Sequence, residues 1–211
     1  DTARSRGLGD VYKRQQNNPA NPFFDSRLPL VADFTFGGEE ITVINNHFSS
    51  KGGSSPLFGT RQPADQRQND PAVNGSLDER IDQANAVNAY VEGILAAEPD
   101  AKIIAAGDFN EFEFIEPLEI LESNLVNLTN TLPENERYTF IFEGNAQSLD
   151  HILVSPNLAE TAQFEVMHLN SEFPTFGQAS DHDPLIVGVQ TGFTLEPVSY
   201  THLTLPTIRE V

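Results

Sequence analysis

The sequence predicts a mixed α/β domain built in layers, and three segments carry that prediction. Two apolar, β-branched runs lie on either side of Gly37 and Gly38, as in a β-hairpin. A long segment at 76–98 places apolar residues at helical spacing, and a short apolar run at 102–106 follows it. Strands interleaved with helices in this way build a sheet that helices cover.

The first two strands are expected at 28–36 and 40–48. The run LPLVADFTF precedes the Gly-Gly pair, and EITVINNHF follows it and becomes polar at its end. Glycine accepts the positive φ angles that a two-residue hairpin turn requires, so these strands are expected to pair antiparallel.

The longest helix is expected to begin at Ser76. Ser76 followed by Glu79 fits a capping box, in which side chains bond the unpaired N–H groups of the first turn. Pro99 ends the pattern, since proline cannot continue a helix. The apolar residues at helical spacing are Ile81, Ala84, Val87, Val91, Ile94 and Leu95.

The remaining elements are shorter. The run KIIAA at 102–106 is almost entirely apolar, which is typical of a strand buried on both faces. A second helix is expected at about 116–122. Further strands are expected at 138–142, 149–154, 164–169 and 185–189.

The charge of the chain limits its partners. Its 211 residues include 12 basic and 31 acidic ones, a formal net charge of −19, whereas proteins that bind polyanions normally have a basic surface. Divalent metals could supply the positive charge, the substrate could be small, or the protein could work at high salt. A solvated acidic surface on a secreted protein explains the charge equally well.

The absence of cysteine excludes disulfides and thiolate metal sites. Carboxylate, amide and imidazole ligands would favour a hard divalent metal, Mg²⁺ first, with Mn²⁺ or Ca²⁺ as alternatives. No stretch approaches the ~20 apolar residues of a membrane span. We expect a monomer in an extracellular or periplasmic setting.

The two ends of the chain differ from the segment between them. Residues 1–15 and 197–211 hold five of the 12 basic residues and lack clean helical or strand periodicity. They resemble translated adapter sequence around a fragmentary reading frame, and ordinary disordered termini are the alternative. A domain at 16–196 between two non-native tails is therefore expected.

A polar segment rich in Gly and Pro spans 49–74. Loops of this length are uncommon in compact domains and are usually functional or mobile. Lys51, Arg61 and Arg67 lie in it, and Arg80 follows it, which concentrates positive charge in a very acidic chain. This loop is interpreted as part of a site, with a solvated insertion as the alternative.

Four polar motifs lie at the ends of the expected strands. NNHF closes the strand before 49, GDFN follows KIIAA, SLDH opens the strand at 149–154, and SDHDP precedes the last strand. A histidine such as His47 at the end of a strand reaches a polar cleft at the rim of the sheet. There it could transfer a proton or hydrogen-bond a phosphoryl oxygen.

The spacing within these motifs suits hydrolysis. Asp108 and Asn110 face the same side of an extended segment, which suits a metal-bound water and an oriented phosphate. Asp150 lies between apolar residues and needs a buried partner, such as a charged imidazole or a metal; capping the preceding turn is the alternative. Asp181 and His182 point in opposite directions if extended, so one can meet a metal while the other faces a substrate.

These motifs, in this order and at these strand ends, resemble the endonuclease/exonuclease/phosphatase superfamily, which includes deoxyribonuclease I-like enzymes. The run NHFSSKG and the LDH form resemble its bacterial extracellular nucleases in particular. The resemblance covers about 22–190. It implies a two-sheet α/β sandwich with the site at one rim, of which the N-terminal half is missing here.

The resemblance also implies roles for single residues. His47 would hydrogen-bond the scissile phosphate or assist the leaving group. Asp108 and Asn110 would position the attacking water and the phosphate. Asp150 would orient His182, which would act as the base or as a phosphate-stabilising imidazolium.

Metal and substrate contacts are expected nearby. The reaction would be in-line attack of water on a phosphoester, with a divalent ion offsetting the charge of the phosphoryl oxygens. The residues expected to bind the metal are Asp108, Asn110 and Asp181. Those expected to bind the substrate are Asn46, Lys51 and Arg80.

One departure from the superfamily pattern limits the expected activity. Its members carry an Asn and a metal-binding Glu in their first half, and nothing before NNHF supplies them, because Glu39 and Glu40 follow a hairpin turn at the wrong side. The chain is therefore expected to be weakly active or inactive alone. Its unpartnered sheet would expose apolar surface and an edge.

Three functions are compatible with these residues. The superfamily motifs favour a metal-dependent phosphodiester hydrolase that acts on nucleic acid as an endonuclease or exonuclease. The net charge favours a phosphatase or phosphodiesterase for small phosphoesters of the inositol phosphate or sphingomyelin type. An acidic, non-enzymatic cell-surface module is the third, and it leaves the histidine and aspartate motifs unexplained.

Overall fold

The computed structural model describes residues 2–4, 18–55 and 72–191. Its centre is a six-stranded sheet with the order β1-β2-β3-β4-β8-β5. β3 and β4 run parallel, and the other neighbours pair antiparallel. The strands are β1 (Thr2–Arg4), β2 (Leu30–Phe36), β3 (Glu39–His47), β4 (Lys102–Asp108), β5 (Val126–Asn127) and β8 (Asp150–Val154).

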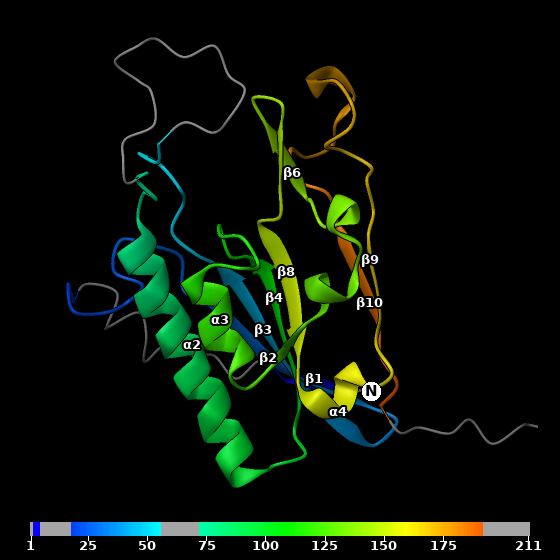
Figure 1. Cartoon of the computed structure of the whole chain (residues 1–211). Helices are drawn as coiled ribbons and strands as arrows, with labels where there is room; N and C mark the ends of the chain where they lie inside the picture. The colour runs from blue at the N-terminus through cyan, green and yellow to red at the C-terminus, as the bar shows by residue number, and fades with distance from the viewer. Residues whose placement is uncertain (1, 5–17, 56–71, 192–211) are drawn as a thin grey trace, which may run out of the picture.

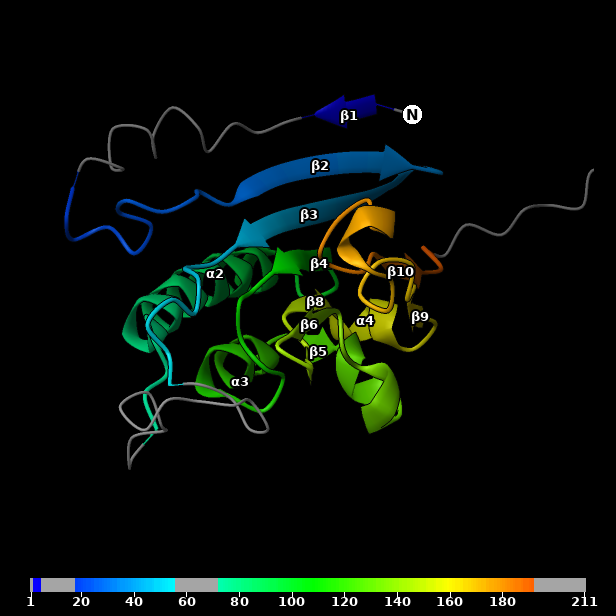
Figure 2. The ribbon, with the colours of Figure 1, turned by 90° about the horizontal axis from the view of Figure 1, so that it is seen from above.

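Helices cover one face of this sheet, and a second, two-stranded sheet lies on the other (Figures 1 and 2). The covering helices are α2 (Leu77–Ala97) and α3 (Glu116–Glu122). The second sheet pairs β9 (Gln163–Val166) with β10 (Leu185–Gly188), and α4 (Pro156–Ala159) lies near it. The prediction of an α/β fold with two sheets is confirmed.

Short elements complete the described chain. β6 (Phe140–Phe142) and β7 (Asn145–Gln147) form a separate hairpin. The 3-10 turns are η2 (Leu128–Thr131), η3 (Glu134–Glu136) and η4 (Thr175–Gly177). None of the helices in the described ranges combines the length and the apolar character that a lipid bilayer requires.

The hairpin predicted across Gly37 and Gly38 is confirmed. Both glycines have positive φ, 58° and 87°, and Phe36 pairs with Glu39 across the two-residue turn. Backbone twist in this type of turn matches the right-handed twist of the strands, which explains the glycine pair. The turn fixes the register, so that β3 delivers its polar end to the far rim of the sheet.

The long helix is confirmed, but the capping box is wrong. Ser76 has a φ of 53°, in the left-handed region, and its side chain makes no capping hydrogen bond. A capping side chain needs an extended backbone at this position in order to reach the N–H groups of the first turn. The Ser76 carbonyl instead accepts a hydrogen bond from the backbone N–H of Arg80.

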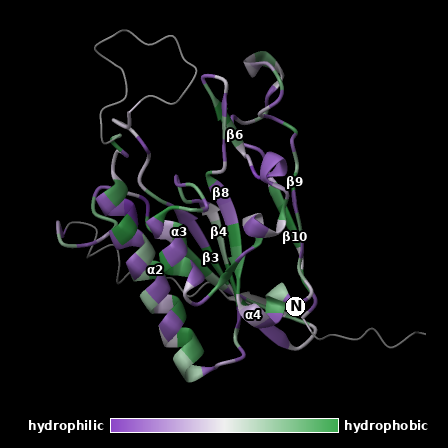
Figure 3. Cartoon of the chain, viewed as in Figure 1, coloured by the Kyte–Doolittle hydropathy of each residue, from purple (hydrophilic) through white to green (hydrophobic). Residues whose placement is uncertain are grey.

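Two apolar clusters hold the layers together. The larger packs α2 and α3 on the sheet, with Val87 and Val91 of α2 against residues such as Ile44 and Ile103. The smaller lies on the opposite face, where β8 meets β9 and β10. Figure 3 shows β8 hydrophilic at its upper end and hydrophobic below, so the polar site lies at the rim of a buried layer.

Several segments differ from expectation or fall outside the described residues. Thr2–Arg4 pairs with β2, although no strand was expected in the first 15 residues. Short elements such as β5, β7 and α4 were not anticipated, because two to four residues are too few to show a periodicity. The loop at 56–71 and the C-terminal tail at 197–211 lie outside the described residues.

Candidate active site

Three polar side chains lie in a row across neighbouring strands. In the register of the sheet, His47 of β3 is opposite Asp108 of β4, and Asp108 is opposite Asp150 of β8. Residues that are opposite one another project from the same face, so the three side chains gather at one rim. His47 Nε2 lies 3.4 Å from Asp108 Oδ2, and the His47 side chain is 42% exposed. The first three motifs therefore meet.

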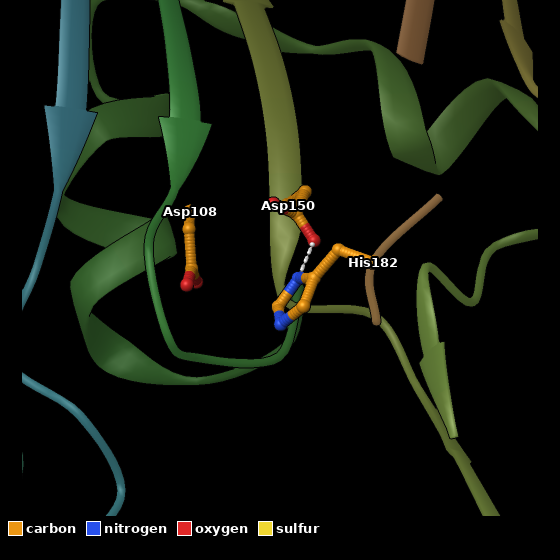
Figure 4. A group of neighbouring side chains, drawn as sticks. All are labelled: Asp108, Asp150 and His182. Atoms are coloured by element: carbon orange, nitrogen blue, oxygen red, sulfur yellow. Dashed lines mark hydrogen bonds and ion pairs between the residues drawn. The ribbon is translucent and has the colours of Figure 1, made fainter. Parts of the chain in front are cut away.

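The fourth motif reaches the same rim from the segment before β10. His182 Nδ1 donates a hydrogen bond of 2.6 Å to Asp150 Oδ2. Figure 4 shows the imidazole beside the end of β8, with the Asp108 carboxylate directed toward the same space. Because Asp150 occupies Nδ1, Nε2 is the nitrogen that His182 has left for a ligand or a proton.

A strained turn holds Asn110 on Asp108. Gly107 has a φ of 133°, and a Cβ there would lie 2.0 Å from the Asn46 carbonyl oxygen, so only glycine fits. Asn110 has a φ of 52°. Its backbone N–H donates to Asp108 Oδ1 at 2.8 Å, and its side-chain amide donates to Asp108 Oδ2 at 3.2 Å. The two side chains do lie together, but through a turn and not along the extended segment that was expected.

Asp150 has a second partner that the motifs did not reveal. The hydroxyl of Thr139 donates to Asp150 Oδ2 at 2.7 Å and accepts from the backbone N–H groups of Leu149 and Asp150, each at 3.2 Å. Thr139 is fully buried. It therefore fixes the carboxylate that orients His182. Only its place just before β6 could have indicated this role.

The electrostatics of the site follow from this packing. The hydrogen bond to Asp150 raises the pKa of His182 above 6.5 despite its burial, and the charges of Asp150 and Asp108 add to this effect. Burial and the charge of Asp150 raise the pKa of Asp108 above 3.8, against the hydrogen bond from Asn110. Two carboxylates are thus held close together, and each is more stable beside a cation.

Solved structures share the fold of this chain. The chain superposes on truncated Caenorhabditis elegans TDP2 with a TM-score of 0.53 and 16% identity, over 74% of this chain and 57% of that one. Human Nocturnin, whose catalytic domain holds a sulfate anion, gives 0.51 and 17%, over 77% and 52%. The mannosyl-6-phosphatase Bt3783 of Bacteroides thetaiotaomicron gives 0.51 and 16%, over 77% and 56%. The chain has the endonuclease/exonuclease/phosphatase fold.

This chain spans only part of the length of these solved structures. The chain covers between about half and three fifths of the length of these three structures. The sequence matches no protein-family model and no curated protein. Likeness at this level of identity extends to the fold, and the chemistry has to be argued from the residues of the rim.

A group at this rim of the endonuclease/exonuclease/phosphatase fold could hold a metal. Asp108, Asp150 and His182 each offer a ligand atom, and these atoms lie within 4.8 Å of one another. Two carboxylates and one imidazole suit a divalent ion of the Mg²⁺ or Mn²⁺ class. A bound cation would also offset the burial and the charge of Asp150, which together raise the pKa of Asp108. The donor set therefore fits a metal.

The expected metal ligands are only partly brought together. Asp181 is exposed and is not a member of the group. The Asn110 amide group donates to Asp108 and to the carbonyl of Phe48, so it positions a carboxylate. Asp150, whose expected partner was a charged imidazole or a metal, is hydrogen-bonded to His182 and is also a member of the group.

Arg80 is a correction to the expected substrate contacts. Its side chain is 0% exposed, and its guanidinium donates to Glu111 Oε2 at 2.8 Å and to the backbone carbonyls of Ser49 and Gly75. A buried arginine is stable only when its donors are paired in this way. Arg80 therefore ties the start of α2 to the loop after β3 and to the chain after β4.

Lys51 and Asn46 are also directed inward. The Lys51 ammonium group pairs with Glu111 and donates to Asn74 Oδ1 at 2.8 Å. Asn46 is 3% exposed and lies on the face of β3 opposite to His47. Substrate contact is therefore wrong for Asn46, and Lys51 is engaged by a carboxylate.

Glu111 is the centre of this network and was missed by the sequence analysis. Burial raises the pKa of its carboxyl, but hydrogen bonds from Lys51 and Asn74, together with the charge of Arg80, bring it below 4.5. Glu111 directly follows Asn110. The network therefore braces the turn that carries Asp108 and Asn110. A buried acid cannot be distinguished from the many exposed ones in an acidic chain.

His151 belongs to the core although it lies beside Asp150 in the LDH motif. It is 0% exposed, and burial lowers its pKa, so the ring is neutral. Its Nε2–H donates to the Glu111 carbonyl at 2.9 Å, and its Nδ1 accepts from the Thr129 hydroxyl at 3.0 Å. The two histidines of the site are therefore His47 and His182.

Proposed function

We propose that the chain is a metal-dependent phosphodiester hydrolase whose chemistry takes place at the rim of the sheet. The observation that carries the proposal is the row of His47, Asp108 and Asp150 across three strands, closed by His182. The solved structures of this fold add support, since one is a mannosyl-6-phosphatase and another holds sulfate, a tetrahedral anion like phosphate.

Each residue of the rim has a proposed role in this reaction. Water attacks phosphorus in line, its oxygen forms the new P–O bond, and the bond to the leaving oxygen breaks. Asp108, held in place by Asn110, would orient the water, and His47 would hydrogen-bond the phosphate or the leaving oxygen. His182 uses Nε2, either to accept the proton of the water or, as imidazolium, to stabilise the phosphoryl oxygens.

A divalent ion would complete this chemistry. Held by the carboxylates of Asp108 and Asp150 beside His182, it would offset the negative charge that accumulates on the phosphoryl oxygens, and Nε2 of His182 would stay available for the proton. Asp150 accepts the hydrogen bonds from Thr139 and His182 through Oδ2, so Oδ1 would be the oxygen available to a metal. The residues present therefore suit both the metal and the oriented imidazole.

Small phosphoesters are the second candidate substrate class. The cations Lys51 and Arg80 are both engaged by Glu111, and the chain carries a net charge of −19. An extended nucleic-acid backbone would therefore find few free cations among the described residues. This observation favours a short substrate or a mononucleotide ester over duplex DNA.

The substrate class can be tested with two chromogenic esters of the same leaving group. The purified chain is given bis(p-nitrophenyl) phosphate, a diester, or p-nitrophenyl phosphate, a monoester, in Mg²⁺ or Mn²⁺. We expect slow release of p-nitrophenol from the diester, abolished by EDTA and restored by metal. Preference for the monoester would favour the phosphatase, and rates that are indifferent to EDTA would overturn metal dependence.

A further inference from the structure

A two-stranded hairpin begins at the candidate site and extends away from it. β6 and β7 are joined by Glu143 and Gly144, whose φ angles of 50° and 81° form the same type of turn as the first hairpin. Figure 1 shows the hairpin reaching beyond the end of β8. A backbone bridge joins its first residue, Phe140, to His182. The hairpin is thus anchored to the backbone of His182.

Aromatic rings run along one face of this hairpin. The Phe140 ring stacks on the His182 ring, with centroids 4.6 Å apart and planes at 26°. Phe142 stacks on Phe140 in turn, at 6.2 Å and 13°. His182, Phe140 and Phe142 therefore form one column of nearly parallel rings, which starts at the candidate site and ends on an exposed strand.

The end of the column is open to solvent. Phe142 is 50% exposed, although burying an aromatic side chain is strongly favourable. Ile141, between the two phenylalanines, points to the other face of the strand and is 38% exposed. The hairpin therefore presents an aromatic face that continues the column and an aliphatic face that does not.

The charges of the chain indicate what the column could recognise. Of the described cations that the sequence placed near the site, Lys51 and Arg80 are held by Glu111, so uncharged contacts would contribute much of the affinity for the group esterified to a phosphate. A planar π-system is the group that extends a column of parallel rings. Nucleobases stack on aromatic side chains in this way, with little dependence on sequence.

We propose that the β6–β7 hairpin is a stacking platform for a nucleobase next to the scissile phosphate. The substrate class is then single-stranded nucleic acid or a nucleotide ester. This inference rests on the proposed hydrolase function, because it names the substrate of the same site. Phe142 would contact the base. Phe140 stacks on both Phe142 and His182 and so connects the contact to the site.

The absence of tryptophan from the sequence allows a direct test. The Phe142→Trp variant carries a single fluorophore at the end of the column, and Ile141→Trp carries one on the opposite face as a matched control. Each is titrated in Mg²⁺ at low salt with a short phosphorothioate oligothymidylate, or with a strand of equal length that lacks bases. We expect saturable quenching only for Phe142→Trp with the base-bearing strand.

A competition experiment supplies the affinity. Phe142→Ala is expected to bind the oligothymidylate about tenfold more weakly than the wild type, as alanine substitution of a stacked ring does. Phe142→Tyr, which keeps the ring, should bind like the wild type. Equal quenching of both tryptophan variants, quenching by the strand without bases, or no quenching at all would overturn the platform.

Turnover is measured separately so that the two proposals can fail independently. The wild-type chain is incubated with an ordinary oligothymidylate in Mg²⁺ and with the same strand in EDTA. Quenching without metal-dependent cleavage would retain the platform and refute the hydrolase. Cleavage without quenching would retain the hydrolase and refute the platform.

Discussion

Asp150 connects more of the site than any other described side chain. It lies opposite Asp108 in the sheet, receives the Thr139 hydroxyl, and holds Nδ1 of His182. The sequence predicted that an acid between apolar residues needs a charged partner, and the imidazole is that partner. Thr139 could not be predicted, because a single threonine just before a strand is too common to indicate a role.

The pKa of His182 tests this pairing in the metal-free protein. The Asp150 hydrogen bond raises this pKa above 6.5, so Asp150→Asn is expected to bring it back toward 6.5. Because the folded pKa exceeds the unfolded value, the pairing stabilises the fold below 6.5, and this stability is lost as the pH rises through the folded pKa. The measurement is an NMR titration of the imidazole protons in EDTA.

Asp181→Asn is the control for this titration. The charge of Asp181 is the smallest of the causes that act on His182, so its removal should lower the pKa less than Asp150→Asn does. Equal shifts for both variants would show that the hydrogen bond is not the dominant cause.

Glu111 provides the second prediction at the scale of residues. Glu111→Gln leaves Arg80 buried without its carboxylate, and we expect the free energy of unfolding at neutral pH to fall by about 3–5 kcal/mol. Since the pKa of Glu111 is lowered, its contribution is present above 4.5 and is lost as the pH falls through the folded pKa. Urea denaturation at several pH values measures both effects.

An exposed ion pair is the matched control for Glu111. Glu39 pairs with Lys102 at 2.6 Å, but its side chain is 42% exposed. Glu39→Gln is therefore expected to cost about 0–1 kcal/mol. Similar losses for the two variants would contradict the central position of Glu111.

At the scale of elements, strands and helices with a clear period were predictable from the sequence. The Gly-Gly turn, the apolar spacing of α2 and the run KIIAA each carry a local signal that the tertiary structure keeps. The inner face of α2 was only partly predictable, since buried Arg80 and Gln83 share it with the apolar residues. A polar side chain on a buried face is indistinguishable in sequence from one on the surface until its partners are known.

The junction of β3 and β4 provides a prediction about element packing. Gly107→Ala places a Cβ against the Asn46 carbonyl, and that backbone cannot move without breaking the register that aligns His47 with Asp108. We expect a loss above about 4 kcal/mol or a failure to fold. Circular dichroism during urea denaturation measures the change.

A glycine in α2 gives the opposite expectation for the same substitution. Gly93 lies within the helix, and a Cβ there would meet nothing within 4 Å. Gly93→Ala should therefore stabilise the chain by about 0.5–1 kcal/mol. If Gly107→Ala were as well tolerated as Gly93→Ala, the close approach of β3 and β4 would be refuted.

At the scale of the whole molecule, the net negative charge affects both folding and substrate binding. A net charge of −19 opposes both compact folding and the approach of a phosphoester, and a divalent ion at the rim would reduce both effects locally. Mn²⁺ at about 100 times its dissociation constant is expected to stabilise the fold by ~2.7 kcal/mol, since it binds only the folded chain. Thermal unfolding with and without Mn²⁺ measures this.

Variants of Asp108 and Asp181 test which acids bind the metal. Asp108→Asn should lose most of the stabilisation by Mn²⁺, whereas Asp181→Asn should keep it, because Asp181 lies outside the group of ligand atoms. A shift that disappears with Asp181→Asn and persists with Asp108→Asn would place the metal elsewhere.

Hydrolysis by the His182→Ala variant tests the central claim most directly. The wild-type chain and the variant are given the same diester in Mg²⁺, with folding of both checked by circular dichroism. We predict slow hydrolysis by the wild type, EDTA-sensitive and reduced about 10²-fold or more in the variant, since its imidazole moves or holds a proton at the phosphate. Equal metal-dependent rates for the two proteins, or hydrolysis that EDTA leaves unchanged, would contradict a hydrolase centred on this rim.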